Sequence, residues 1–350
     1  AQQGYRMQFW VRKAEGALKQ EVDPRIPVHV IPTCGRIRSV SDFMRLLCQE
    51  RPDALLVIAA LLDGFVPILA RQFARTPTRV AVHNNTYWSQ ALKEERRFSR
   101  NRLLAVWGSR LLYPRADAIL AVSQGVAHDA ARVLKLPLER IHVVYNPTIT
   151  PDLQEKACAP LEHPWFTEGY PPIVLAAGRL ETPKGFDVLL RSFASVRQQM
   201  DARLVILGKG SQRESLLELA AQLGVADSVD LPGFEPNPFR YMSRASVFVL
   251  SSRYEGLPNV LIQAMACGCP VVSTNCPSGP EEILDGGKYG ELTPVDNPSA
   301  LAEAIIRVLR GERKHVPAAW LDQFRLETVA ARYLEGLLGK NPQESAPPCR

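Results

Sequence analysis

Short apolar runs alternate along the chain with longer stretches that have helical periodicity. Runs rich in Val, Ile, Leu and Ala predict strands at 54–60, 78–82, 117–122 and 141–145, and again at 173–178, 202–208, 247–252 and 270–274. Helical patterns such as Phe43–Glu50 and Val126–Leu134 lie between them. This alternation is typical of α/β proteins whose parallel sheets are covered by helices on both faces. Two such sets of strands predict two Rossmann-like domains.

The pattern also predicts where these domains begin and end. We expect a first domain at 1–150, a Pro-rich linker at 151–172, and a second domain at 173–320. The seam at 146–172 has neither a clear helical nor a clear strand pattern. An amphipathic stretch at Leu321–Leu338 predicts a closing helix within 321–340, and the polar, Pro-rich tail at 341–350 is expected to be disordered. The first residues, AQQGYRMQFWV, resemble the end of a helix followed by a strand, so we expect an upstream strand, loop and most of a helix to be absent from this chain.

Composition narrows the classes of function. The 350 residues are 46% hydrophobic, which is enough for two cores, and the net charge is +6. This mild excess argues against a nucleic-acid partner and is compatible with acidic small ligands or an anionic membrane surface. The seven cysteines form no paired framework, which favours reduced thiols and a cytoplasmic location. Cys267 and Cys269 flank a glycine without completing a metal-binding set, so we expect no metal site and small buried thiols instead.

Polar residues follow several of the predicted strands. In open parallel sheets ligands bind beyond the carboxyl ends of the strands, and there the sequence places Arg179, Lys184, Gly208, Glu255 and, in the first domain, His83. Arg179 and Lys184 suit a diphosphate, although each alone would more often be a solvated surface cation. Gly208 can allow close approach of a ligand to the backbone, or can simply form a tight turn. Neither a P-loop nor a G-x-G-x-x-G fingerprint is present.

The stretch around Glu255 has the most distinctive pattern. Pro258 and Gly268 predict a helix from Pro258 to Cys267, and the N–H groups at its start form a site for a phosphate. A carboxylate beside that anion site is better aimed at hydroxyl groups, and Gln263 lies about two turns into the helix. A ligand with both phosphates and hydroxyls fits, which predicts a sugar nucleotide. His83 is expected to point into the cleft opposite Glu255, although a lone histidine is more often structural.

These motifs resemble a known family. The segments GRLETPKGFDVLLRSF, LVILGKG, SRYEGLPNVLIQAMACGCPVVST and CPSGPEEI, with AVSQGV and YNP in the first half, are similar to those of family 4 retaining glycosyltransferases of the GT-B fold. The resemblance covers nearly the whole chain. It implies two Rossmann-like domains that face a nucleotide-sugar cleft, and a last helix that crosses back to the first domain. The family's first strand and its Gly-rich loop have no counterpart here.

The resemblance also implies roles for individual residues. Arg179 and Lys184 match the diphosphate-binding pair, and Glu255 matches the first acid of a Glu-x7-Glu motif that contacts the donor sugar. Gln263 stands where the second acid binds the ribose, and His83 matches a histidine near the transferred sugar. Donor contacts from Gly208, Phe234, Gly256 and Leu257 complete the set. Such enzymes use no cofactor or metal, because cations and helix ends hold the leaving diphosphate.

The acceptor side is less well defined by the sequence. Residues 88–113 mix basic and apolar residues, which is typical either of a helix lying on an anionic membrane or of a covering helix with a solvated basic face. We expect a retaining, metal-independent transfer from a nucleotide-sugar, with UDP as the nucleotide, to a glycan or lipid-linked acceptor in cell-envelope polysaccharide synthesis at the inner membrane face. The alternatives are a non-catalytic nucleotide-sugar-binding or scaffold protein, which Gln263 favours, and a GT-B sugar-nucleotide epimerase.

Overall fold

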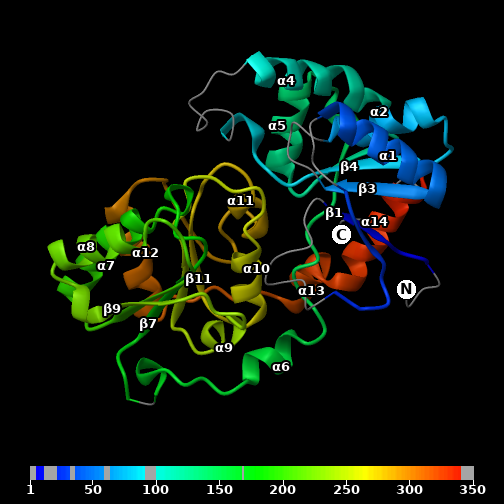
Figure 1. Ribbon diagram of the computed structural model, residues 1–350. Coiled ribbons are helices and arrows are strands. Elements are labelled where there is room, and N and C mark those ends of the chain that lie inside the picture. The colour runs from blue at the N-terminus through cyan, green and yellow to red at the C-terminus, as the bar shows by residue number, and fades with distance from the viewer. Residues whose placement is uncertain are drawn as a thin grey trace.

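The computed structural model describes residues 5–11, 22–31, 36–58, 64–90, 100–167 and 169–339. Two bodies of parallel strands and covering helices stand side by side, and the C-terminal helix lies with the first of them (Figure 1). The fold is therefore α/β with two parallel-sheet domains, as the strand–helix alternation predicts. The tail at 341–350, which was expected to be disordered, lies outside the described residues.

The first domain holds a four-stranded sheet and a separate two-stranded sheet, both parallel. The larger sheet has the order β3-β4-β5-β6, with strands Ala54–Ile58, Arg79–Asn84, Ala118–Ala121 and Ile141–Val143. The smaller pairs β1 (Phe9–Val11) with β2 (Val28–Val30). A doubly wound sheet of order 3-2-1-4-5-6 would carry one strand between these two sets, and no described residues form it. The helices of this domain are α1 (Arg36–Glu50), α2 (Phe65–Ala74), α4 (Arg100–Leu112) and α5 (Gln124–Leu134).

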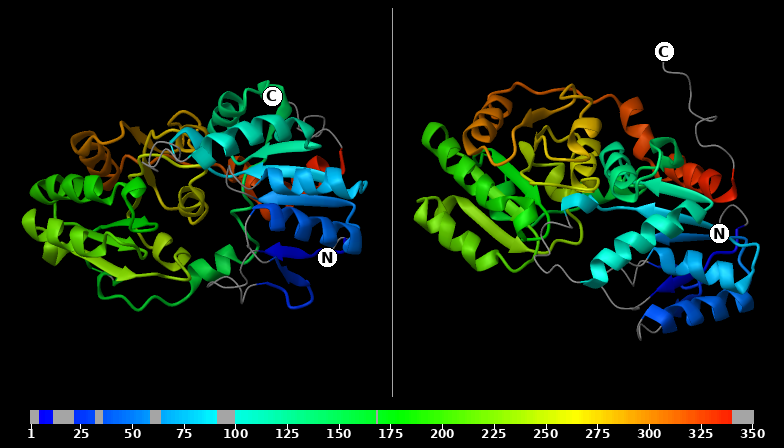
Figure 2. Two further views of the ribbon diagram at one scale, coloured as in Figure 1. Left: turned by 45° about the horizontal axis from the view of Figure 1, so that its top comes forward. Right: turned by 90° about the horizontal axis from the view of Figure 1, so that it is seen from above.

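The second domain is built on one six-stranded parallel sheet of order β12-β11-β10-β7-β8-β9. In chain order its strands are Ile173–Ala177, Arg203–Leu207, Val229–Gly233, Val247–Leu250, Val271–Thr274 and Glu291–Thr293. Its helices are α7 (Phe186–Gln199), α8 (Arg213–Gln222), α9 (Phe239–Met242), α10 (Asn259–Ala266), α11 (Pro280–Ile283) and α12 (Pro298–Leu309). Helices α7 and α12 pack on one face of the sheet and α10 on the other, which buries the apolar strands on both sides (Figure 2).

Two expectations about the connecting segments need correction. The seam at 146–172 contains a short helix, α6 (Leu153–Cys158), whose buried Leu153 and Ala157 pack beside α9. The closing segment is also interrupted, because α13 (Ala318–Leu321) and a 3-10 turn precede α14 (Leu326–Leu338). These pieces are short, and tertiary burial rather than a long periodic pattern stabilises them.

Helix α14 crosses back to the first domain, as expected. It packs against β3, β4 and β5, where Val329 is fully buried with Leu120 and Val144. Arg79 donates from Nε to the Leu337 carbonyl at 2.8 Å, which ties the end of the helix to the start of β4. The last helix of the described residues is thereby part of the first domain's core.

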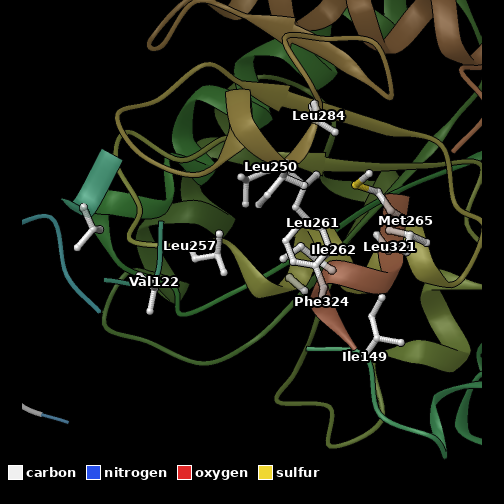
Figure 3. Close-up of a cluster of buried hydrophobic side chains, with 14 of the residues drawn as sticks. Val122, Ile149, Leu250, Leu257, Leu261, Ile262, Met265, Leu284, Leu321 and Phe324 are labelled. Carbon is white, nitrogen blue, oxygen red and sulfur yellow. The ribbon is translucent and has the colours of Figure 1, made fainter. Parts of the chain in front are cut away.

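One apolar cluster runs through both domains without interruption. It includes Val122 and Ile149 of the first domain together with Leu257, Leu261 and other residues of the second (Figure 3). Phe324, which is 1% exposed, lies in the same cluster just before α14. Because apolar side chains of both domains pack in one cluster, the hydrophobic effect contributes to the observed docking.

Candidate functional site

Four neighbouring strands of the second sheet end at the same edge and present the predicted ligand groups there. Strands β10, β7, β8 and β9 lie in that order, and their ends lead to Glu255, Arg179 with Lys184, Gly208, and Phe234 respectively. Because all four strands are parallel, their carboxyl ends meet at one edge. The structure therefore brings the second-domain residues of the predicted site together.

Glu255 and Lys184 form an ion pair at this edge. Lys184 Nζ lies 2.6 Å from Glu255 Oε1, and the side chains are 20% and 10% exposed respectively. Ser252 Oγ donates to the same Oε1 at 2.7 Å. Among the described residues nothing donates to Oε2, so half of the carboxylate remains available to accept a hydrogen bond from a ligand hydroxyl.

The loops that carry these two residues are bound to each other through their backbones. Arg253 N donates to the Pro183 carbonyl at 2.8 Å, and Ser251 Oγ donates to the Lys184 carbonyl at 2.8 Å. Gly185 has a φ of +63°, and a Cβ added there would lie 2.1 Å from the Ser251 carbonyl oxygen. Only glycine fits this crossing, so the sequence Lys184-Gly185 sets the lysine beside the acid turn.

Arg253 stabilises the same turn, and it was not identified from the sequence. Its guanidinium bonds both carboxylate oxygens of Asp187 at 2.8 and 2.9 Å, and its Nε lies 2.8 Å from Asp296. A bidentate contact of this kind fixes orientation as well as charge. The sequence alone does not reveal the roles of Ser251, Ser252 and Arg253, because their partners include residues of neighbouring loops.

The other predicted donor contacts have different surroundings. Arg179 is exposed, and Phe234 is 56% exposed just after β9. Gly208 has a φ of +145°, and a Cβ there would lie 1.8 Å from the Gly178 carbonyl oxygen. The packing of two strand ends thus already requires glycine at 208, whether or not a ligand approaches it.

Helix α10 begins close to Glu255 in sequence, and it starts one residue later and ends one residue earlier than the predicted helix from Pro258 to Cys267. Its first N–H groups have no partner within the helix and form the positive end of its dipole. Gln263 lies partly exposed in its second turn, and Leu257 is buried just before it. This edge therefore carries a helix start, the Lys184–Glu255 pair, the exposed Arg179 after β7, and a carboxylate oxygen to which no described residue donates.

Thiol chemistry is not available at this edge. Cys276 is 3% exposed, and burial together with the nearby Glu255 raises its pKa to about 12. Since the thiolate is the nucleophilic form, the raised pKa disfavours Cys276 as a nucleophile at neutral pH. Cys269 is also buried, and burial raises its pKa to about 12. No group of three or more His, Cys, Asp or Glu side chains in the described part of the chain is arranged to hold a metal ion.

His83 does not have the expected orientation. Its side chain is 3% exposed and faces α14, where Nε2 lies 2.9 Å from the Tyr333 hydroxyl and the rings meet edge to face. In β4 it pairs in register with Leu120, which packs against the same helix. The expectation that it points into a cleft opposite Glu255 is corrected: side chains alternate along a strand, and α14 covers the face that His83 occupies. Burial lowers its pKa from 6.5 to about 4, so the imidazole is neutral at pH 7.

The first domain contacts the acid turn through backbone rather than through His83. A Cβ added at Gly256 would lie 2.2 Å from the Asn85 carbonyl oxygen, and Asn85 follows β4. Asn146 Nδ2 donates to Asn259 Oδ1 at 3.0 Å, at the start of α10. The predicted donor residue Gly256 is therefore also a point of contact between the domains.

Comparison with known proteins agrees with this architecture. Residues 1–147 match the family model described as a glycosyl transferase 4-like domain, and residues 171–311 match the model for glycosyl transferases group 1. A diphospho-undecaprenol 4-alpha-N-acetylgalactosaminyltransferase of Campylobacter jejuni is 30% identical over 281 residues, which is 78% of this chain and 74% of that protein. The lipopolysaccharide core biosynthesis glycosyltransferase LpsE of Rhizobium meliloti is 31% identical over 247 residues, or 68% and 69% of the two chains.

Solved structures show the same fold. The apo lipopolysaccharide outer core galactosyltransferase WaaB superposes with a TM-score of 0.69 at 21% identity, covering 91% of this chain and 85% of the other. HepE from Anabaena in complex with UDP superposes with a TM-score of 0.76 at 19% identity, covering 95% and 99%.

The buried state of His83 predicts how stability depends on pH. Because its pKa in the folded protein lies below 6.5, the unfolded chain binds the proton first as the pH falls. This contribution to stability is fully present above about pH 6.5 and is lost toward about pH 4, amounting to about 3 kcal/mol. Glutamine does not take up this proton and can still bond Tyr333. We therefore expect His83→Gln to lose less free energy of unfolding than the wild type as the pH falls from about 6.5 to about 4. Urea unfolding at several pH values measures it, with the exposed His128→Gln as control; equal slopes in all three proteins would contradict the burial of a neutral imidazole.

The contact of Gly256 with the first domain predicts that a side chain at this position would loosen the contact between the domains. Gly256→Ala places a methyl group against the Asn85 carbonyl, so we expect the two domains to separate there while each stays folded. Hydrogen exchange at amides 123–126 should then be at least about tenfold faster, with the amides of β7 and β8 unchanged. Gly108→Ala is the matched control, because its added Cβ would meet nothing closer than 4.0 Å. Unchanged exchange in Gly256→Ala would show that the turn does not hold the domains together.

Proposed function

Because the chain belongs to the glycosyltransferases of the group 1, 4-like family with the GT-B fold, we propose that it transfers a sugar with retention from a UDP-sugar to a lipid-linked glycan in cell-envelope polysaccharide synthesis. The observation that carries the proposal is the Lys184–Glu255 pair at the start of α10. It joins a cation, a carboxylate with a free oxygen and a helix N-terminus, as a sugar diphosphate requires. The relatives from Campylobacter jejuni and Rhizobium meliloti support the class of acceptor.

In this proposal the charges at the edge have separate tasks. Lys184 has three N–H donors, so it can keep its bond to Glu255 while it also contacts a phosphate. Arg179 and the start of α10 hold the remaining negative charge, which removes the need for a metal ion. Glu255 Oε2 accepts a bond from a sugar hydroxyl and fixes the ring above the diphosphate. His83 has no direct role here, because Tyr333 occupies its Nε2.

The transfer step then needs no nucleophile from the protein. The bond between the anomeric carbon and the diphosphate oxygen breaks, and the acceptor oxygen forms its bond to that carbon on the same face. The proton of the acceptor hydroxyl moves to the departing phosphate oxygen, so the products are the extended acceptor and the nucleoside diphosphate.

The acceptor side offers an exposed apolar pair for membrane contact. Trp107 and Leu111 lie one turn apart on α4 and are 64% and 48% exposed. No helix in the described ranges is long and apolar enough to cross a bilayer. A lipid-linked acceptor requires the enzyme to meet the membrane surface, and we propose this end of α4 for it; Lys93, Arg96 and Arg97 lie outside the described residues.

Substitutions of Glu255 and Lys184 should have different effects on sugar transfer and on UDP binding. Glu255→Ala is expected to lower transfer at least about a thousandfold while calorimetric binding of UDP stays within threefold, because the contact that it removes from the bound donor is to the sugar, and Lys184 keeps its charge for the phosphates. Lys184→Met is expected to weaken UDP binding at least about tenfold, since it removes a charge-assisted bond to phosphate. Titrations with GDP and ADP test the choice of base, and Glu214→Ala, exposed on α8, is the control. Wild-type transfer in Glu255→Ala would remove its proposed role, and UDP binding without any transfer in the wild type would favour a scaffold.

The membrane contact has its own test. Trp107→Ala combined with Leu111→Ala should reduce co-sedimentation with vesicles of anionic phosphatidylglycerol at least about tenfold, because each side chain would lose burial among the acyl chains. Tyr170→Ala is the control, since Tyr170 is 47% exposed in the linker. Equal sedimentation of all variants would place the membrane contact elsewhere or exclude it.

A further inference from the structure

The amino end of α5 meets the acid turn of the other domain. Ser123 caps α5, and its Oγ accepts a bond from Val126 N at 3.1 Å. The same Oγ lies 2.8 Å from the Gly256 carbonyl oxygen and 2.6 Å from Ser278 Oγ, which itself lies 2.6 Å from that carbonyl. Two hydroxyls, one from each domain, therefore share the carbonyl of the residue that directly follows Glu255.

A carboxylate from the second domain caps the same helix. Glu282, on α11, accepts at Oε2 from Gln124 N at 2.9 Å and from the Tyr145 hydroxyl at 3.3 Å. Gln124 is the first residue of α5, so a negative charge lies at the positive end of an 11-residue helix. Burial raises the pKa of Glu282, so taking this acid out of water has a cost that its first-domain partners offset.

The backbones at this point are too close for any side chain. A Cβ added at Gly125, the second residue of α5, would lie 2.6 Å from Ser278 Cα. Together with the contact of Gly256 and Asn85, this makes two places where glycine permits the domains to touch. A small separation of the domains would break both contacts and the serine network at once.

We propose that the amino end of α5 is a clamp on the acid turn that carries Glu255, and that Glu282 is the positioning residue that holds it shut. This inference rests on the proposed function, because it concerns how the donor sugar is oriented. When the clamp is shut, Ser123 and Ser278 hold the Gly256 carbonyl and thereby the Glu255 carboxylate. When it opens, the turn loses these bonds, so docking of the domains and orientation of the sugar occur together.

The test compares Glu282→Ala and Glu282→Gln with the wild type. Glu281→Ala is the matched control, since this neighbouring acid of α11 is exposed. Glu282→Ala is expected to raise the radius of gyration in small-angle scattering and to lower kcat/KM for the donor at least tenfold, while UDP alone binds within threefold of the wild type. Glu282→Gln keeps an acceptor oxygen for Gln124 N and should lie between Ala and wild type in both readouts. Glu281→Ala should match the wild type.

Ser278→Ala provides a second variant that leaves Glu282 in place. It removes one hydroxyl from the Gly256 carbonyl, and we expect it to lower kcat more than it changes UDP affinity. If Glu282→Ala does not fold, the scattering and kinetics of Glu282→Gln and Ser278→Ala test the clamp in its place. Wild-type scattering and wild-type kcat/KM in Glu282→Ala would overturn the clamp. A wild type that neither binds UDP nor transfers sugar would overturn the proposed function instead, and the scattering comparison would still test the clamp.

Discussion

The parallel direction of the second sheet is the constraint on which the site depends. Four adjacent strands end at one edge, so residues separated by up to 76 positions in sequence, Arg179 and Glu255, are carried by neighbouring strands. The backbone bonds between the loops at 181–185 and 251–256 then set Lys184 against Glu255. A charged pair this sheltered loses hydration, and the bonds from Ser252 and the nearby helix end offset part of that loss.

The first domain completes this edge through packing and backbone contact. The apolar cluster that spans both domains favours their association but is non-directional, because burial of apolar area does not select one orientation. Orientation comes from the short contacts at Gly125 and Gly256 and from the bonds of Ser123 and Glu282. Their individual contributions are about 1 kcal/mol each, yet they act only when all are aligned. Docking is thus driven by the apolar surface and positioned by a few polar atoms beside Glu255.

The sequence predicts much of this site because its chemistry is local. Strand ends, the Pro258 and Gly268 signals of α10 and the positions of Glu255 and Lys184 all follow from short patterns, and the resemblance to a family adds roles to them. His83 shows the limit: the strand predicts that it lies near the edge, but which face it occupies depends on α14, which is more than 240 residues away in sequence. Glu282 and Ser278 were missed for the same reason. They occur in the quoted segment CPSGPEEI, but their partners Gln124, Tyr145 and Ser123 belong to the other domain.

The charges of the predicted donor-binding residues suggest a physical reason for an amide, rather than a carboxylate, at Gln263. Among the predicted donor-binding residues, Arg179 and Lys184 are cations, Glu255 is an anion, and Gln263 is neutral. A carboxylate at position 263 would strengthen a contact to a hydroxyl group and would weaken the attraction of this edge for a diphosphate. In the proposed donor site the contact of Gln263 with the ribose is a neutral hydrogen bond, weaker by about 1 kcal/mol than one to a carboxylate. In the proposed donor site, Gln263 therefore shifts the balance of donor recognition from the ribose toward the phosphates, which is compatible with an active transferase.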